Sequence, residues 1–165
     1  VNALANPMFS KSSGTARFSC SSGVCRLNLG TLQQGSGTVS DTLSLQNLVS
    51  GPADELTGDF DFSLFNGFGK SGFGAVDLAA GDFVDGLTLS LDTTAAGSYS
   101  SSFTFNGISH NPFQDNYALG SIQFRLTANV IDANGGGNVP EPGTLGLLLI
   151  AVVGALRARA HRSLH

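Results

Sequence analysis

A strict alternation of apolar and polar side chains recurs along the first 131 residues. In the clearest case the apolar residues Ile122, Phe124, Leu126, Ala128 and Val130 alternate with polar ones. Successive side chains of a β-strand point to opposite faces, so a two-residue period predicts a strand with one buried and one solvated face. The same pattern predicts strands over 42–46, 59–64, 87–92 and 99–105, and weaker ones over 15–20 and 24–29.

Turn-forming dipeptides separate these segments, among them Gly51-Pro52, Asp85-Gly86 and Asn106-Gly107. No stretch before Pro140 has the 3.6-residue period of an amphipathic helix. Seven or eight short strands with frequent turns are typical of a sandwich of two antiparallel sheets. The sequence therefore predicts an all-β sandwich over residues 9–131, followed by a flexible Gly-rich linker over 132–138.

Near the end of the chain the strand pattern stops and an apolar segment follows. Thr144 to Leu156 is uncharged, and as a helix it would span only about 20 Å. A helix over 143–162 reaches about 30 Å, the thickness of a bilayer core, because the arginines at its end extend to the headgroups. These arginines are Arg157, Arg159 and Arg162. We expect a single transmembrane helix, because no polar face marks the alternative of a buried amphipathic helix.

Charge orients this segment. Five of the eight basic residues and eleven of the twelve acidic residues lie in residues 1–138, which gives that part a net charge of −6. The positive-inside rule places the arginines in the cytoplasm and the acidic body outside. An acidic body also argues against nucleic acid as a partner. Ala3-Leu4-Ala5 fits a signal-peptidase site, so residues 1–5 are either a signal-peptide remnant or a chance match.

The order of parts in the tail is the most specific motif of the chain. The apolar segment is preceded by Val139, Pro140, Glu141 and Pro142 and is followed by the arginine cluster. Over residues 139–165 this order closely resembles the PEP-CTERM sorting signal of Gram-negative bacteria. One departure is that the arginines alternate with alanine and are followed by Ser163 to His165, where the family often has a tight basic cluster.

The resemblance implies a route for the protein. Such tails hold an exported protein at the inner membrane, with its body in the periplasm. An exosortase, a membrane-embedded cysteine transpeptidase, then processes it near the Pro-Glu-Pro. The implied destination is the cell surface or an extracellular matrix rich in exopolysaccharide, as in a biofilm. Proline keeps residues 139–142 extended, which suits a protease-like site.

The body carries a second resemblance. The segments "LNLGTLQQGSGTVSDTLSLQNL", "LAAGDFVDGLTLSLDTTAAGSYSSSFTF" and "IQFRLTANV" resemble immunoglobulin-like sandwich domains that often precede such anchors. The likeness covers about residues 27–131. It implies an immunoglobulin-like arrangement of strands and includes no catalytic signature.

Two cysteines, Cys20 and Cys25, enclose four residues in "CSSGVC". This spacing suits a hairpin in which the two are cross-strand neighbours, and export favours oxidation. We therefore predict a disulfide, with two free thiols as the alternative. A metal site would need two further ligands, and His110 is the only histidine before the tail. We expect neither a metal nor a cofactor.

Three patterns are weak candidates for chemistry. Residues 67–72, "GFGKSG", fit a dinucleotide-binding motif by letter, but no helix follows, so we expect a mobile loop. Asp59 and Asp61 share one strand face, which we interpret as solvated, although paired carboxylates can also act as acid and base. His110 lies in "SHNPF", where we expect a surface loop.

These patterns predict a non-enzymatic protein. The alternative is an extracellular module that binds carbohydrate or calcium. Calcium would use Asp77, Asp82 and Asp85, which surround one predicted loop. Carbohydrate faces usually display exposed aromatic rings, and only Tyr99 and Tyr117 are obvious candidates.

Overall fold

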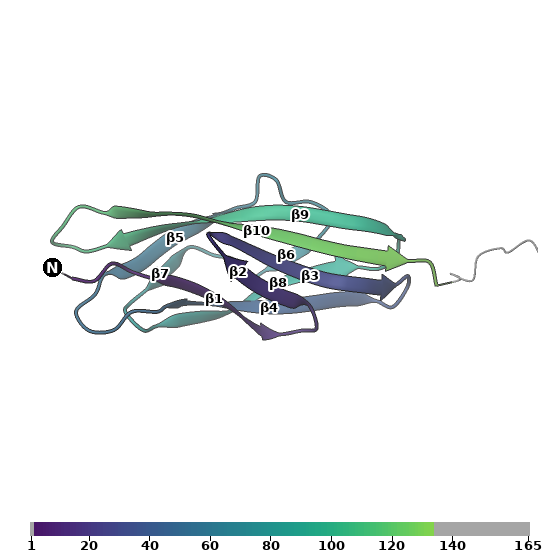
Figure 1. Cartoon of the computed structure of the whole chain (residues 1–165), viewed down its shortest axis with the longest axis horizontal. Coiled ribbons are helices and arrows are strands. Elements are labelled where there is room, and N and C mark those ends of the chain that lie inside the picture. The colour runs from purple at the N-terminus through teal and green to yellow at the C-terminus, as the bar shows by residue number, and fades with distance from the viewer. Residues whose placement is uncertain (1, 134–165) are drawn as a thin grey trace, which may run out of the picture. The chain divides into compact units, whose positions relative to one another are not determined.

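Ten strands in two sheets make up residues 2–133, the part of the chain that the computed structural model describes (Figure 1). One sheet has four strands in the order β1-β4-β8-β6, and the other has six in the order β2-β3-β10-β9-β5-β7. The strands are β1 (Pro7–Ser13), β2 (Arg17–Ser21), β3 (Val24–Gln33), β4 (Thr38–Asn47), β5 (Glu55–Asp61), β6 (Gly69–Ser71), β7 (Val76–Leu78), β8 (Phe83–Asp92), β9 (Gly97–His110) and β10 (Tyr117–Ile131). The predicted all-β sandwich is confirmed.

Every segment with the two-residue period contains a strand, and three further strands have no such signal. In β1 only Phe9 is buried, all of β6 is exposed, and β7 has just three residues. A period cannot be recognised over so short a stretch. β6 also corrects the expected mobile loop at residues 67–72, because Gly69 to Ser71 pair with β8 as an edge strand.

The named strands pair antiparallel, as predicted, except that β3 and β10 run parallel. These two strands are far apart in sequence, so no hairpin fixes their relative direction. Figure 1 shows β10 between β3 and β9 in the six-stranded sheet. This parallel contact brings residues of the first and last parts of the body side by side.

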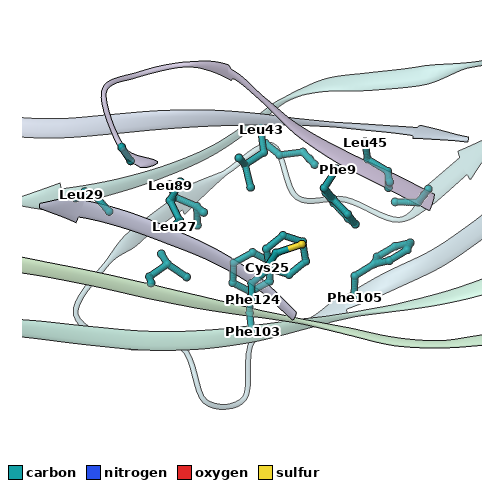
Figure 2. Packing of buried hydrophobic residues seen from close by; sticks show 14 of the residues in the cluster. Phe9, Cys25, Leu27, Leu29, Leu43, Leu45, Leu89, Phe103, Phe105 and Phe124 are labelled. Atoms are coloured by element: carbon teal, nitrogen blue, oxygen red, sulfur yellow. The ribbon is translucent and has the colours of Figure 1, made fainter. Parts of the chain in front are cut away.

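The core lies between the two sheets (Figure 2). Phe103, Phe105 and Phe124 on β9 and β10 are at most 2% exposed. The Phe103 and Phe124 rings stack with centroids 4.4 Å apart, and Phe9 from β1 packs edge-on against Phe124 at 4.7 Å. Full burial of one such side chain contributes about 1.5–3 kcal/mol. Leucines of β4 and β8 complete the core from the other sheet.

Aromatic packing continues past the end of β5. Phe60 and Phe62 pack against the core, as the alternation predicts. Continued to the end of the strand predicted over 59–64, the same alternation predicts that Leu64 faces inward, and this is wrong, because Leu64 is 70% exposed. β5 ends at Asp61, whose carboxylate accepts the Ser63 N–H, and a turn follows. The turn breaks the two-residue period before Leu64.

Candidate functional site

The sorting residues predicted from the sequence lie outside the described residues. This applies to Val139, Pro140, Glu141 and Pro142, to Arg157, Arg159 and Arg162, to the predicted helix over 143–162 and to most of the 132–138 linker. Residues 2–133 contain no helix that is long and apolar enough to cross a membrane. The structure therefore bears on the body, and its candidate sites follow.

Cys20 and Cys25 form the predicted disulfide. They are opposite each other in the β2–β3 hairpin, whose two turn residues, Ser22 and Gly23, have φ of 50° and 74°. Two positive φ values are typical of a tight type I′ hairpin turn. Cys25 is buried in the core and Cys20 is exposed. The bond thus fixes an edge hairpin to the sandwich and leaves no free thiol within residues 2–133.

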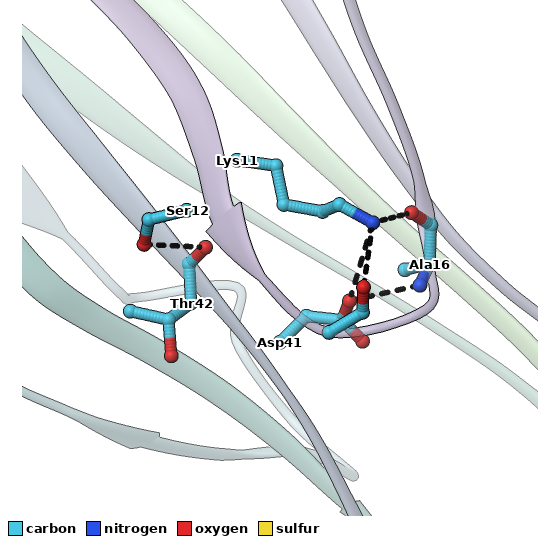
Figure 3. Close-up of polar contacts among 6 residues, drawn as sticks. Lys11, Ser12, Ala16, Asp41 and Thr42 are labelled. Carbon is cyan, nitrogen blue, oxygen red and sulfur yellow. Dashed lines mark hydrogen bonds and ion pairs between the residues drawn. The ribbon is translucent and has the colours of Figure 1, made fainter.

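The crossing from β1 to β2, which changes sheets, is held by two charged residues (Figure 3). The Asp41 carboxylate is fully buried, and its Oδ1 accepts the Ala16 N–H at 2.8 Å. Lys11 Nζ lies 3.9 Å from that oxygen and donates to the Gly14 and Ala16 carbonyls. Asp41 Oδ2 is buried without a hydrogen-bond partner. Lys11 Nζ and Asp41 Oδ1 therefore hold the loop that crosses from β1 to β2.

A second buried carboxylate, Asp54, lies directly before β5. Its Oδ2 accepts the Ser109 hydroxyl at 2.8 Å, and its Oδ1 accepts Asn111 Nδ2 at 2.9 Å. These two hydrogen bonds, led by Asn111, hold the pKa of Asp54 below its ordinary value although burial opposes them. Both carboxylate oxygens are occupied within the fold, so this cluster stabilises the junction of β5 and β9.

The Asp54 cluster also binds the N-terminal residues. The Ser109 hydroxyl accepts the N–H of Ala5, which is 4% exposed, and Ala3 forms a parallel bridge with Ala53. Asn47, fully buried, accepts the Asn6 N–H and donates to the Asp54 carbonyl. The structure therefore places Ala3 and Ala5 against the body. That residues 1–5 are a signal-peptide remnant stays a prediction.

The three arginines within residues 2–133 lie together on the outer face of the six-stranded sheet. Arg125 on β10 is the register partner of Arg26 on the parallel strand β3. Arg17 on β2 is opposite Asn28, diagonal to Arg26, and all three side chains are exposed. Neighbouring strands are about 5 Å apart, so the three charges form one patch, which we call the arginine face.

A shallow groove of about 480 Å³ adjoins the arginine face. Arg125 lines it, and its Nε and Nη2 both donate to Gln123 Oε1, at 3.1 and 3.0 Å. Ser100, Ser102 and Thr127 add hydroxyl groups to its lining, and Leu126 and the exposed Leu64 add apolar surface. The groove thus offers one oriented guanidinium among hydroxyl donors.

The acidic candidates do not come together. Asp59 and Asp61 are both exposed on β5, in agreement with a solvated strand face. Asp77 lies on β7 and Asp85 on β8, in different sheets, and Asp85 accepts the Ser12 hydroxyl and the Gly86 N–H, which lower its pKa. Residues 2–133 contain no group of three acidic, histidine or cysteine side chains able to hold a metal ion. Calcium binding at these aspartates has no support in this geometry.

His110 is the last residue of β9 rather than part of a loop, which corrects the sequence expectation. β9 extends through His110 because it pairs with Glu55 at the start of β5. Its Nδ1 is 2.7 Å from Asn116 Oδ1, across the following loop. Of the two tyrosines, Tyr117 is 56% exposed, whereas the Tyr99 hydroxyl donates to the Ala95 carbonyl. A more exposed ring is Phe113, which sequence reasoning did not consider.

Sequence reasoning also missed the two buried carboxylates and the arginine face. A signal was present for one of these, Asp41. Asp41 continues the inward positions of Leu43 and Leu45 on β4, as does Asn47, which binds the Asp54 carbonyl, so the two-residue period places both inside. The arginine face needs the pairing of β3 with β10, which joins residues about 100 positions apart and leaves no local pattern.

Comparison with known proteins supports both resemblances. Residues 138–162 match the family model of the PEP-CTERM protein-sorting motif. No match was found among curated proteins. Among solved structures, the ASH/PapD-like domain of human CEP192 (PapD-like domain 7) is similar, with a TM-score of 0.54 and 10% identity over 79% of this chain and 89% of that one. At this identity the similarity concerns the fold, and the predicted immunoglobulin-like sandwich is confirmed.

Two other structures are more distant. The Vibrio cholerae VesB protease has a TM-score of 0.48 and 22% identity, with 63% of this chain and 30% of that chain covered. A protein of unknown function from Porphyromonas gingivalis W83 has a TM-score of 0.43 and 14% identity, with 78% of this chain and 50% of that chain covered. No conclusion about this chain rests on either.

Proposed function

We propose that this chain, which carries a PEP-CTERM sorting motif at residues 138–162, is a non-enzymatic surface or matrix protein of a Gram-negative bacterium. The motif marks an exported, membrane-anchored precursor that is processed by an exosortase. The finer steps are part of the proposal. The body stands in the periplasm before processing, and it then moves to the cell surface or to an exopolysaccharide-rich matrix.

The observation that carries the proposal is the coincidence of the family match with the three-part order of the tail. Pro140 to Pro142 supply the processing site. The segment 143–162 supplies the membrane anchor, and its arginines, Arg157, Arg159 and Arg162, act as the cytoplasmic stop. Each part has a separate physical role. Processing that removes the anchor would release the body from the inner membrane.

The contacts of the body favour a structural role over catalysis. The groups that catalysis would use are engaged in holding the fold together: Asp54 by Ser109 and Asn111, and the cysteines by each other. His110 pairs with Asn116. A carbohydrate-binding role is the second candidate, and the observation that favours it is the groove beside Arg125, whose lining combines hydroxyl groups with apolar surface.

Peptide mass spectrometry of fractionated cells tests the sorting proposal. In a host with the cognate exosortase, protein outside the inner membrane should lack Leu145 to His165, and in an exosortase-deficient host the full chain should stay in the inner membrane. Replacing Pro140, Glu141 and Pro142 by alanine should leave insertion intact and block processing. Replacing the three tail arginines by glutamate should instead impair retention or orientation. Intact C-terminal peptides in the surface fraction would contradict the proposal.

A further inference from the structure

The arginine face places like charges side by side with no acidic partner. Arg26 and Arg125 are register partners, and Arg17 is the diagonal neighbour of Arg26 on its other side. Like charges on neighbouring strands destabilise a sheet. No ion pair joins any of the three to an acidic side chain within residues 2–133, where the closest charged pair is Lys11 with Asp41 in the other part of the fold. An anion bound at this face would relieve that repulsion.

The surroundings of the three arginines are polar without being charged. Next to them on β10, β9 and β3 the outward residues are Gln123, Thr127, Ser100, Ser102 and Asn28. Hydroxyl and amide side chains both donate and accept hydrogen bonds, as sugar hydroxyls do. The Gln123 contact holds the Arg125 guanidinium and leaves its Nη1 group available for a carboxylate. Leu64 supplies an apolar rim against which a sugar ring can pack.

We propose that the arginine face and its groove bind an acidic polysaccharide. Arg17, Arg26 and Arg125 pair with carboxylates spaced along the polymer, and the serine, threonine and glutamine side chains bind its hydroxyl groups. The inference deepens the proposed function and rests on it in one respect, since only an exported body meets such a polymer. The site itself is argued from residues 17–127 and does not depend on the tail.

Two other occupants fit the charges less well. Nucleic acid is a denser polyanion, and a body of net charge −6 with only three clustered arginines repels most of its length. A second copy of the chain offers Asp59 and Asp61 from the same sheet face. However, protein interfaces are centred on apolar and aromatic residues, and the outward side chains around the arginines are almost all polar.

The proposal is tested by measuring how the full-length chain, in neutral detergent at low salt, binds alginate, which is a polymer of uronic acids. Neutral dextran is the control polymer. Wild type should bind alginate and not dextran, and Arg26→Gln with Arg125→Gln should weaken binding at least about tenfold. Lys70→Gln is the matched control, because it removes one charge from β6 in the opposite sheet and should change binding by less than about twofold. The tail arginines are the same in every variant.

A second variant sharpens the test. Asp59→Asn with Asp61→Asn removes negative charge from the same face and should strengthen alginate binding. Equal binding by the Arg26→Gln/Arg125→Gln and Lys70→Gln variants would overturn the proposal, as would equally tight binding of single-stranded DNA. A wild-type dimer that the arginine variant dissociates would make the face an interface between copies. Failure of exosortase processing would leave the alginate result unchanged, so the two proposals fail separately.

Discussion

Within residues 2–133 the burial of side chains follows a two-residue period that recurs in the long strands, whereas the sorting signal occupies one continuous segment, 138–162. The human PapD-like domain has a similar fold at 10% identity, so many sequences satisfy the first kind of pattern. The sorting signal, in contrast, is recognised from the order of particular residues in one segment. We therefore expect substitutions in the body to change stability and leave sorting intact, and substitutions in the motif to do the reverse.

The largest effect on the body should come from Phe124→Ala. Phe124 is 1% exposed and contacts the rings of Phe103 and Phe9, so the cavity should lower the free energy of unfolding by about 3–5 kcal/mol. Phe113→Ala is the matched control, because Phe113 is 93% exposed and should change stability by less than about 0.5 kcal/mol. Urea denaturation of residues 1–138 measures both. Equal effects would mean that the core is misplaced.

Gly14→Ala tests the loop that crosses between the sheets. A Cβ at Gly14 would collide with the Asp41 carboxylate, and the φ of Gly14 is +99°. Gly37 has a similar φ of +94°, but open space surrounds it. Both substitutions strain the backbone, so their difference isolates the Asp41 contact, which we expect to be about 1–3 kcal/mol by thermal or urea unfolding. Equal destabilisation would show that Asp41 does not pack against this loop.

The disulfide should have a modest effect. The loop between Cys20 and Cys25 is short, so closing it removes little entropy from the unfolded chain, and its contribution should fall toward the low end of about 0–3 kcal/mol. Thermal unfolding with and without reductant measures the contribution. The Cys20→Ala/Cys25→Ala variant should show no response to reductant. Labelling of both thiols in exported protein without prior reduction would contradict the bond.

The smallest effect concerns pH. The folded state lowers the pKa of Asp54 below its ordinary value of 3.8, so the unfolded state binds the proton more readily. Its stabilising contribution is present above that value and is lost as pH falls through the lower folded pKa. Asp54→Asn should therefore flatten the decline of stability below about pH 4. Asp59→Asn, at an exposed position, serves as the control, and identical profiles for the two variants would contradict the role of Asp54.

The same contrast explains what could be predicted from the sequence. The long strands were predictable because their inward residues recur at every second position, as Leu87, Leu89 and Leu91 do in β8. The Cys20–Cys25 bond was predictable from the hairpin spacing of the two cysteines. β6 and β7 were not, since three residues cannot display a period. The arginine face depends on which distant strands pair. That choice is made by tertiary packing rather than by any segment alone.

One measurement tests most directly whether sorting resides in the tail alone. Residues 134–165 are fused to an unrelated exported carrier protein in a host with the cognate exosortase, and the C-terminus of the carrier is read by intact mass spectrometry. We predict that carrier found outside the inner membrane lacks Leu145 to His165. The same carrier with Pro140, Glu141 and Pro142 replaced by alanine should remain full length in the membrane. A full-length carrier in a host that still processes the native chain would contradict the account and assign part of the signal to the body.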